Sequence, residues 1–328
     1  MNFHPPISYL FVTLMLAFMA ASIKRSKILD FIGERILKGR NERTATMMLI
    51  ALSYILAPFF LSFVLISSFE NYILRFKEKE KILTLLVASA IMGSIITPFG
   101  NLRNIFISIA LGKGTPAIEF NSFVSIMLPL WIASFAIFLA TTYFICEKNE
   151  IKETNIIVEW RKPELIFSII LMFFVFGYFN VGKNYNINIM GLIILGGIFC
   201  VVFMGTGPLK AVNWWLLIPV GVSFVIYYLF HFLTMPELKL NPWIIYLSAS
   251  IGSAGLSSNL LSFILPLLIS NKNIILYAVT VGSLAGILGS YETIWIWKKG
   301  RTKLKLNLLF YMFVILLSIS LIILFLRR

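Results

Sequence analysis

Long runs without a charged residue constrain this chain more than any other feature of its sequence. Most are as long as the roughly 18–20 apolar residues that a helix needs to cross a hydrocarbon core of about 30 Å. The ten runs cover residues 2–22, 44–69, 82–102, 120–146, 165–182, 184–209, 211–230, 240–271, 273–291 and 306–326. Because lipid offers no partners to backbone polar groups, such runs fold as helices. The sequence therefore predicts an all-α polytopic membrane protein.

The formal charge of +14 is concentrated in short segments between these runs. Seven Lys and Arg residues lie in 24–43, four in 75–81, four in 148–162 and five in 298–305. This distribution is typical of cytoplasmic loops beside membrane helices, and it leaves no separate basic domain for nucleic acid. We therefore expect a multi-pass protein of a prokaryotic cytoplasmic membrane, with the lipid bilayer and no nucleic acid among its partners.

The same loops predict where the chain turns back. Loops 24–43 and 70–81 are both basic, so the run between them enters and leaves on one side as a re-entrant hairpin that bends near Ala57-Pro58. Residues 240–271, with Gly and Ser in the middle, suit a second hairpin that opens to the other side. The segment 26–38 has an apolar side and a charged side, which predicts a helix on the cytoplasmic surface. Ten simple crossings are the alternative topology.

Two crossings carry similar helix-breaking residues. A shift of 189 positions superposes Gly93-Ser94 on Gly282-Ser283 and Gly100-Asn101 on Gly289-Ser290. Each stretch follows a predicted hairpin and precedes one final crossing. The sequence thus predicts an inverted-topology repeat with two interrupted transmembrane helices. Its parts are a first repeat at 1–146, a cytoplasmic linker at 147–162 and a second repeat at 163–328.

Interrupted helices predict a binding site, because unwound backbone at membrane depth must face protein or a watery cavity. Close packing of small residues is the alternative explanation. The candidate substrate-binding residues are Ser94, Thr97, Pro98, Gly100, Asn101, Arg103, Ser257, Ser258, Asn259, Gly282, Ser283, Gly289 and Ser290. Arg103 either attracts an anion or extends to the interface or to a carboxylate. Glu292 is a candidate for proton coupling, with an interfacial position beside two tryptophans as the alternative.

Four short motifs resemble those of the ion transporter superfamily that includes arsenite permeases, sodium/proton antiporters and citrate or dicarboxylate carriers. They are Gly93 to Asn101 followed by Asn104, the stretch Val212-Asn213-Trp214-Trp215-Leu216-Leu217, the pair Ser258-Asn259, and Val281-Gly282-Ser283 through Gly289-Ser290. The resemblance spans about residues 20–328. It implies a secondary carrier with alternating access, whose substrate lies between two hairpin tips and two broken helices.

A transporter of a small anion, either an arsenite-like oxyanion or a di- or tricarboxylate, is therefore the expected function. Sodium or a proton is the expected coupling ion, no other cofactor or metal is indicated, and a homodimer stays open. Two alternatives remain. One is a sodium/proton antiporter. The other is a non-transporting protein of the same fold, since no Asn precedes Asn71 in the first hairpin, where the family has one. An enzyme is not expected, because two His, two Cys and few intramembrane acids form no catalytic cluster.

Overall fold

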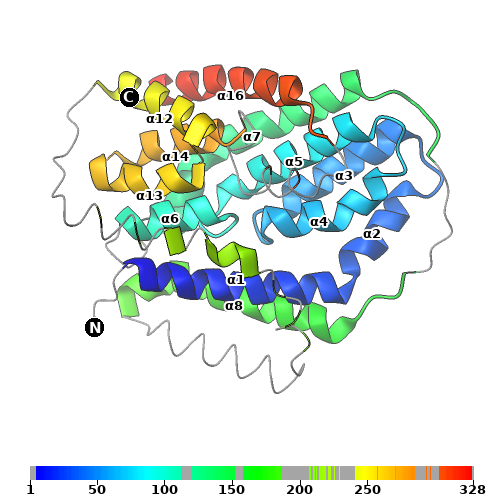
Figure 1. Ribbon diagram of the computed structural model, residues 1–328, viewed down its shortest axis with the longest axis horizontal. Helices are drawn as coiled ribbons and strands as arrows, with labels where there is room; N and C mark the ends of the chain where they lie inside the picture. The colour runs from blue at the N-terminus through cyan, green and yellow to red at the C-terminus, as the bar shows by residue number, and fades with distance from the viewer. Residues whose placement is uncertain are drawn as a thin grey trace.

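A computed structural model describes most of the chain as helices (Figure 1). The described residues are 5–111, 118, 120–151, 158–185, 207, 210, 212, 214–218, 221–222, 225, 229, 241–256, 258–269, 271–284, 293, 296 and 303–326. In the first part of the chain the helices are α1 (Pro5–Ser26), α2 (Ile28–Leu37), α3 (Glu42–Leu56), α4 (Ser62–Ile73), α5 (Lys79–Gly93), the 3₁₀ helix η1 (Ser94–Ile96), α6 (Leu102–Leu111) and α7 (Phe120–Ile145). Then follow α8 (Lys162–Tyr185), η2 (Trp214–Leu217), α12 (Pro242–Leu256), α13 (Ser258–Leu268), α14 (Lys272–Gly282) and α16 (Leu306–Leu326).

Three of these helices are long and apolar enough to cross a membrane. They are α7, the stretch Lys162–Phe179 of α8, and α16. Large apolar side chains on α7, α8 and α16 are exposed on the protein, among them Phe144, Phe173 and Phe325. Because exposed aromatic and aliphatic side chains of this size are costly in water, these surfaces suit a lipid environment. The structure thus confirms the helical fold and is compatible with insertion in a membrane.

Two pairs of helices form tight hairpins. In the first, α3 ends at Leu56 and α4 begins at Ser62, so the bend lies where Ala57-Pro58 predicts it. Proline has no backbone N–H to continue the helix, which explains why α3 stops there. In the second hairpin only Ser257 separates α12 from α13. Neither α3 nor α4, at 15 and 12 residues, reaches the length of a membrane-crossing helix.

The predicted amphipathic segment 26–38 is confirmed as α2, but its apolar side faces protein. Leu29, Ile36 and Leu37 are buried, and α2 packs against α1, α3 and α4. Arg75 fixes this contact with a bidentate pair, because its two terminal nitrogens lie 2.7 and 3.0 Å from the carboxylate oxygens of Glu34. Paired N–H donors facing a carboxylate give a strong and directional contact.

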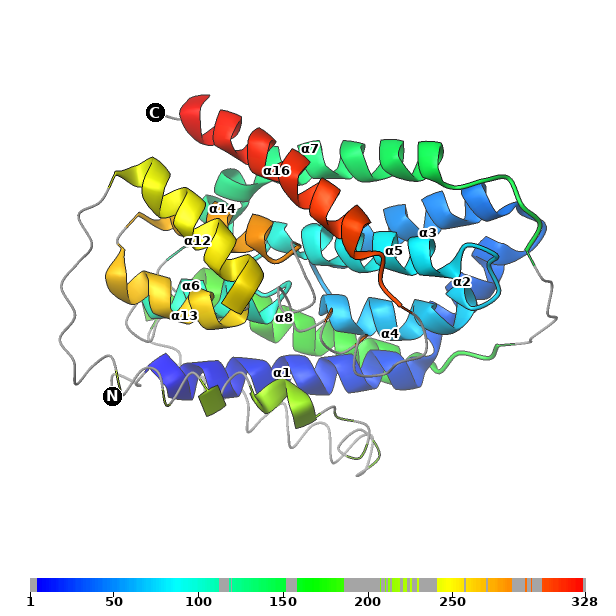
Figure 2. The same cartoon turned by 45° about the horizontal axis from the view of Figure 1, so that its top comes forward.

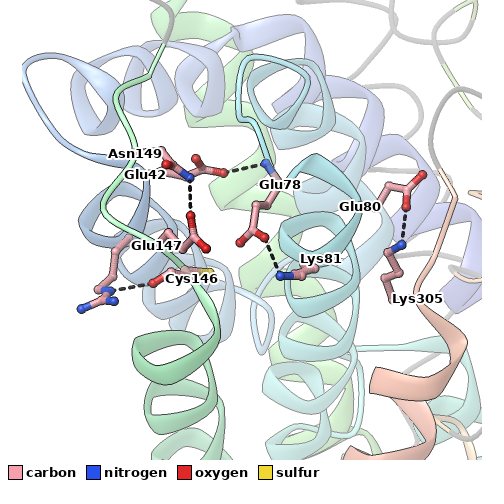
Figure 3. Close-up of polar contacts among 9 residues, drawn as sticks. Glu42, Glu78, Glu80, Lys81, Cys146, Glu147, Asn149 and Lys305 are labelled. Atoms are coloured by element: carbon pink, nitrogen blue, oxygen red, sulfur yellow. Dashed lines mark hydrogen bonds and ion pairs between the residues drawn. The ribbon is translucent and has the colours of Figure 1, made fainter.

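Described residues of the four basic segments meet at one end of the molecule, in a region that we call the basic layer. Besides the pair between Arg75 and Glu34, the backbone N–H of Glu42 donates to Asn149 at 2.7 Å, and Lys305 lies 2.8 Å from the Glu80 carboxylate. Figure 3 shows the ion pair of Lys305 with Glu80, and the contact of Glu42 with Glu78, near the ends of α3, α5 and α16. Both ends of the α3–α4 hairpin are therefore on the same side, because Glu42 begins α3 and its side chain accepts from the N–H of Glu78 at 2.9 Å.

Cys146 lies in the basic layer, and its thiol is expected to be almost unreactive in the folded protein. The residue is 1% exposed. Burial, followed by the negative charges of Glu78 and Glu42, raises the pKa of its thiol to about 11, so the nucleophilic thiolate is scarce at neutral pH. In a Cys200→Ala background, maleimide labelling at pH 7.5 should be at least about 100-fold slower in the native protein than after denaturation. Equal rates in both states would contradict the structure around Cys146.

Contacts between residues that are far apart in the sequence hold the two halves of the chain together. Helix α1 packs along α8, and the hydroxyl of Ser168 donates to the carbonyl of Met19 at 3.4 Å. Helix α13 packs along α6, as both views show (Figures 1 and 2). On α14, the hydroxyl of Tyr277 donates to the carbonyl of Ile126 in α7 at 2.6 Å. The interface between α6 and α13 matters most here, because α6 begins at the predicted site.

Candidate functional site

The centre of the candidate site is the break between α5 and α6, residues 94–101, which we call the broken segment. Helix α5 ends at Gly93, η1 makes one tight turn, and Thr97 is extended with φ −116° and ψ 149°. Pro98 follows, and the residue before a proline prefers such an extended conformation. A Cβ atom on Gly100 would lie less than 3.0 Å from the carbonyl oxygen of Ser94, so only glycine fits where the chain folds back. The predicted interruption is confirmed here.

Two asparagine side chains satisfy the unwound backbone. Asn101 donates to the hydroxyl of Ser94 at 2.8 Å and accepts from the N–H of Asn104 at 3.0 Å, which caps α6. Asn104 donates its amide to the carbonyl of Thr97 at 2.8 Å and lies 3.3 Å from that of Ser94. Both asparagines are buried. The broken segment is therefore a rigid turn, since backbone groups that a helix would pair are bonded to side chains instead.

The bend of the first hairpin is joined to the broken segment. The hydroxyl of Thr97 donates to the carbonyl of Pro58 at 2.6 Å, and both groups are buried. Pro58 is two residues past the end of α3, where carbonyl groups lack partners within the helix. This bond brings the hairpin bend and the interrupted helix to one place, which is the arrangement that the resemblance implies.

A glycine lets the first hairpin lie directly on α5. A Cβ atom on Gly93 would lie 2.7 Å from the Cα of Tyr54 on α3, and closer still to its carbonyl oxygen. Tyr54 then reaches α7, where its hydroxyl donates to the carbonyl of Trp131 at 2.7 Å and lies 2.5 Å from the hydroxyl of Ser134. The indole of Trp131 in turn donates to the carbonyl of Gly93 at 3.0 Å. Helices α3, α5 and α7 are thus in mutual contact at the end of α5.

The second half has a matching set of contacts around Gly282. A Cβ atom there would lie less than 3.0 Å from the carbonyl oxygen of Ser250 and from the Cβ of Ser253, both on α12. Helix α12 also carries a buried tyrosine, Tyr246, whose hydroxyl bonds the hydroxyl of Ser320 on α16. The chain leaves the helix at Ser283, since α14 ends at Gly282. A hairpin arm, a terminal glycine and a following helix are therefore in contact here too.

Several buried polar atoms near these helix ends have no hydrogen-bond partner. They are Asn104 Oδ1 and Ser108 Oγ on α6, Ser253 Oγ on α12, Ser258 Oγ on α13 and Thr280 Oγ1 on α14. These four helices form one group, because α13 packs on α6, and α12, α13 and α6 all contact α14. An unpaired buried polar atom costs about 1–3 kcal/mol, so such atoms are expected to meet water, an ion or a ligand. We call these five the open polar groups.

The open polar groups differ from most of the residues that the sequence singles out. Ser258 is in both sets, whereas Ser94, Thr97 and Asn101 are bonded within the broken segment and its hairpin. Ser283 likewise donates to the carbonyl of Thr280 at 2.6 Å. Ser108, Ser253 and Thr280 were missed, and isolated Ser and Thr residues in apolar helices give no signal for such a role. Asn104 was noted only as part of a motif.

Arg103 lies inside the protein, one residue into α6. It is 2% exposed, and its Nη2 atom donates to the carbonyl of Ile91 at 3.2 Å. The side chain thus turns back toward α5, which contradicts the alternative in which it extends to the interface. A buried guanidinium gives the end of the broken segment a fixed positive charge.

The remaining predicted residues divide into two groups. Asn259 and Pro98 lie at the second hairpin and in the broken segment, as expected. Ser257, Gly289, Ser290 and Glu292 lie outside the described residues. Of the Val212 to Leu217 motif, Trp214–Leu217 forms η2, which contacts α1.

Two buried carboxylates are not among the predicted site residues. Glu42 is 0% exposed and Glu70 is 1% exposed. Glu42 begins α3 beside Glu78 and Cys146 in the basic layer (Figure 3), which is about 20 Å of helix away from the hairpin bend. Among the described residues, no three His, Cys, Asp or Glu side chains gather as metal ligands. The described residues of the candidate site therefore offer neutral hydroxyls and amides and the buried guanidinium of Arg103.

Comparisons with known proteins give no match for this chain, either among family models or among curated proteins.

Proposed function

We propose that this protein is a secondary active transporter of a small anion, and that alternating access moves the substrate past the broken segment. The observation that carries the proposal is the junction of the two halves. Helix α6 begins at the broken segment, α13 of the second hairpin packs along it, and open polar groups lie on both. Polar, incompletely bonded groups between two halves of an apolar protein are typical of transporter sites.

The proposal includes an inverted-topology repeat with two re-entrant hairpins. Its support is the set of matching contacts around Gly93 and Gly282. In each half a hairpin arm lies directly against the glycine that ends a helix, and a tyrosine of that arm bonds a serine of a later helix, Ser134 or Ser320. In a repeat of this kind one half rocks against the other around a central site.

An anion is the proposed substrate because of the donors that the site offers. The hydroxyls of Ser253, Ser258 and Thr280 are buried and can donate, and Arg103 adds a buried positive charge at the start of α6, which packs against α13 and α14. Hydroxyl donors with a nearby guanidinium suit an oxyanion or a carboxylate. A coupling ion, sodium or a proton, remains part of the proposal, since hydroxyl and carbonyl oxygens also suit sodium.

A non-transporting protein of the same fold is the second candidate. The observation that favours it is the bonding within the broken segment, where Ser94, Thr97 and Asn101 are all occupied by protein partners. A turn whose polar groups are satisfied has less reason to take up a ligand. The sodium/proton antiporter has weaker support, because the buried carboxylates of Glu42 and Glu70 lie toward the ends of α3 and α4 that are remote from the hairpin bend.

Transport is tested in proteoliposomes that contain the full chain. Uptake of arsenite, sulfate, a dicarboxylate and a tricarboxylate is measured with an inward sodium gradient, with a pH gradient, and with neither. The proposal expects one class of anion to accumulate under at least one gradient, and to compete with its own class only. Proton flux that follows sodium without any anion would identify the antiporter. Tight, saturable binding or a stable fold without any flux would favour the non-transporting candidate.

A further inference from the structure

A basic cleft lies where the end of α1 meets the start of α8. It has a volume of about 360 Å³ and is lined by Arg25, Lys27, Arg161, Gly207 and Lys210. Among the lining residues that the structure describes, four are cations and none is an acid. None of these residues belongs to the broken segment or to the helices that carry the open polar groups, so the cleft is separate from the transport site proposed above.

The backbone holds this cleft in a defined shape. The N–H of Arg161 donates to the carbonyl of Ser26 at 2.8 Å, which ties the start of α8 to the end of α1. Lys27 has a φ of 56°, a left-handed conformation that costs energy for any residue with a side chain. The guanidinium of Arg25 lies directly against Gly207, where a Cβ atom would overlap it. The positive charges are therefore held together by the fold.

One carboxylate partly balances these charges. Glu164 lies 3.8 Å from Arg25 and 3.6 Å from Arg161, and the side chains of the two arginines are 28% and 61% exposed. At these separations the arginines keep most of their N–H donors for another acceptor. Crowded like charges repel one another, so a bound anion would stabilise the cleft. Arginine pairs are well suited to phosphate, because their forked donors match its oxygens.

The position of the cleft identifies the source of the phosphate. The apolar stretch Lys162–Phe179 begins directly after Arg161, so the cleft lies at the level where that helix would enter the membrane. Lys162 lies 6.0 Å from the ring centre of Trp160, and tryptophan prefers the interface between lipid and water. The cleft is also at the basic end of the chain, which is expected to face the anionic leaflet.

We propose that this cleft binds the phosphate of an anionic phospholipid headgroup. The guanidinium groups of Arg25 and Arg161 donate to the phosphate oxygens, and Lys27 and Lys210 add positive charge. The acyl chains lie along the apolar surface of α8. Bound lipid would brace α1 against α8, because both helices supply cationic side chains to the cleft.

The test uses the full chain in a neutral detergent at about 0.15 M salt, where distant charges are screened. Thermal unfolding is followed while phosphatidylglycerol, phosphatidylcholine or inorganic phosphate is added. Arg161→Gln with Lys210→Gln is the test variant, since both side chains are exposed and neither change should harm folding. Lys148→Gln with Lys303→Gln removes two exposed charges of the same basic end outside the cleft and is the matched control.

We expect phosphatidylglycerol to raise the unfolding temperature and phosphatidylcholine to leave it unchanged. The apparent Kd for phosphatidylglycerol should rise at least tenfold in the test variant and less than twofold in the control. Equal weakening in both variants would show non-specific attraction and overturn the proposal. Full stabilisation by inorganic phosphate alone would also overturn it, because the site would then be one for a free anion.

Discussion

Replacing Gly93 with alanine is expected to force α3 away from α5 and to lower the free energy of unfolding by about 3 kcal/mol. The new Cβ atom would lie 2.7 Å from the Cα of Tyr54 and closer to its carbonyl oxygen. Backbone atoms cannot rotate aside as a side chain can, so the two helices must separate. Separation would also strain the hydrogen bond from Trp131 to the carbonyl of Gly93. The measurement is unfolding of purified protein by heat or denaturant in detergent.

Gly282→Ala should behave in the same way, since its Cβ atom would meet Ser250 and Ser253 on α12. The matched control is Gly177→Ala on α8, where nothing lies within 4 Å of the added atom. There alanine should leave stability unchanged or raise it slightly, because it favours the helix more than glycine does. If all three variants were equally stable, the close approach of each hairpin to its helix end would be wrong.

The second large effect is expected on transport. It distinguishes hydroxyls that bind substrate from hydroxyls that packing merely leaves unpaired. Ser258 and Thr280 are buried, and their hydroxyls bond no protein group. Ser258→Ala and Thr280→Val therefore remove no protein hydrogen bond, and they should leave stability unchanged or raise it by about 1 kcal/mol. If these hydroxyls bind substrate, uptake of the transported anion should fall at least about tenfold, which corresponds to about 1.4 kcal/mol of lost binding.

Ser262→Ala is the matched control for this experiment. Ser262 lies on the same helix as Ser258, and its hydroxyl donates to the carbonyl of Asn259 at 2.6 Å. Its loss should change uptake less than twofold. If the variants at Ser258 and Thr280 are more stable and still transport the anion at the normal rate, these hydroxyls are unpaired polar groups without a ligand.

The sequence predicted the elements of the site because each depends on local chemistry. Pro58 ends α3 and Gly100 turns the chain, and both effects follow from the backbone properties of those residues. The amphipathic helix α2 follows from the spacing of its apolar residues. The basic segments were expected on one side because charge distribution fixes the sides of a membrane protein, and the structure brings them together.

The bonding of the polar residues could not be predicted in this way. Thr97 and Asn101 were expected to face a substrate, yet they bond Pro58 and Ser94. Glu42 follows a basic loop and is fully buried, because Glu78, 36 positions away, supplies the N–H that its carboxylate accepts. Each outcome depends on partners that the fold brings from distant positions.

The sequence by itself determined that this chain forms apolar helices, where the chain breaks between α5 and α6, and which loops carry the positive charge. These properties arise from single residues and short spacings, so no knowledge of the fold was needed. Only the tertiary structure decided that Arg103 turns inward and that Ser253 and Thr280 stay unbonded while Asn101 is satisfied. Whether a hydrogen bond forms depends on differences of a few tenths of an ångström in the distance between donor and acceptor. Where the two groups lie on separate helices, only packing fixes that distance.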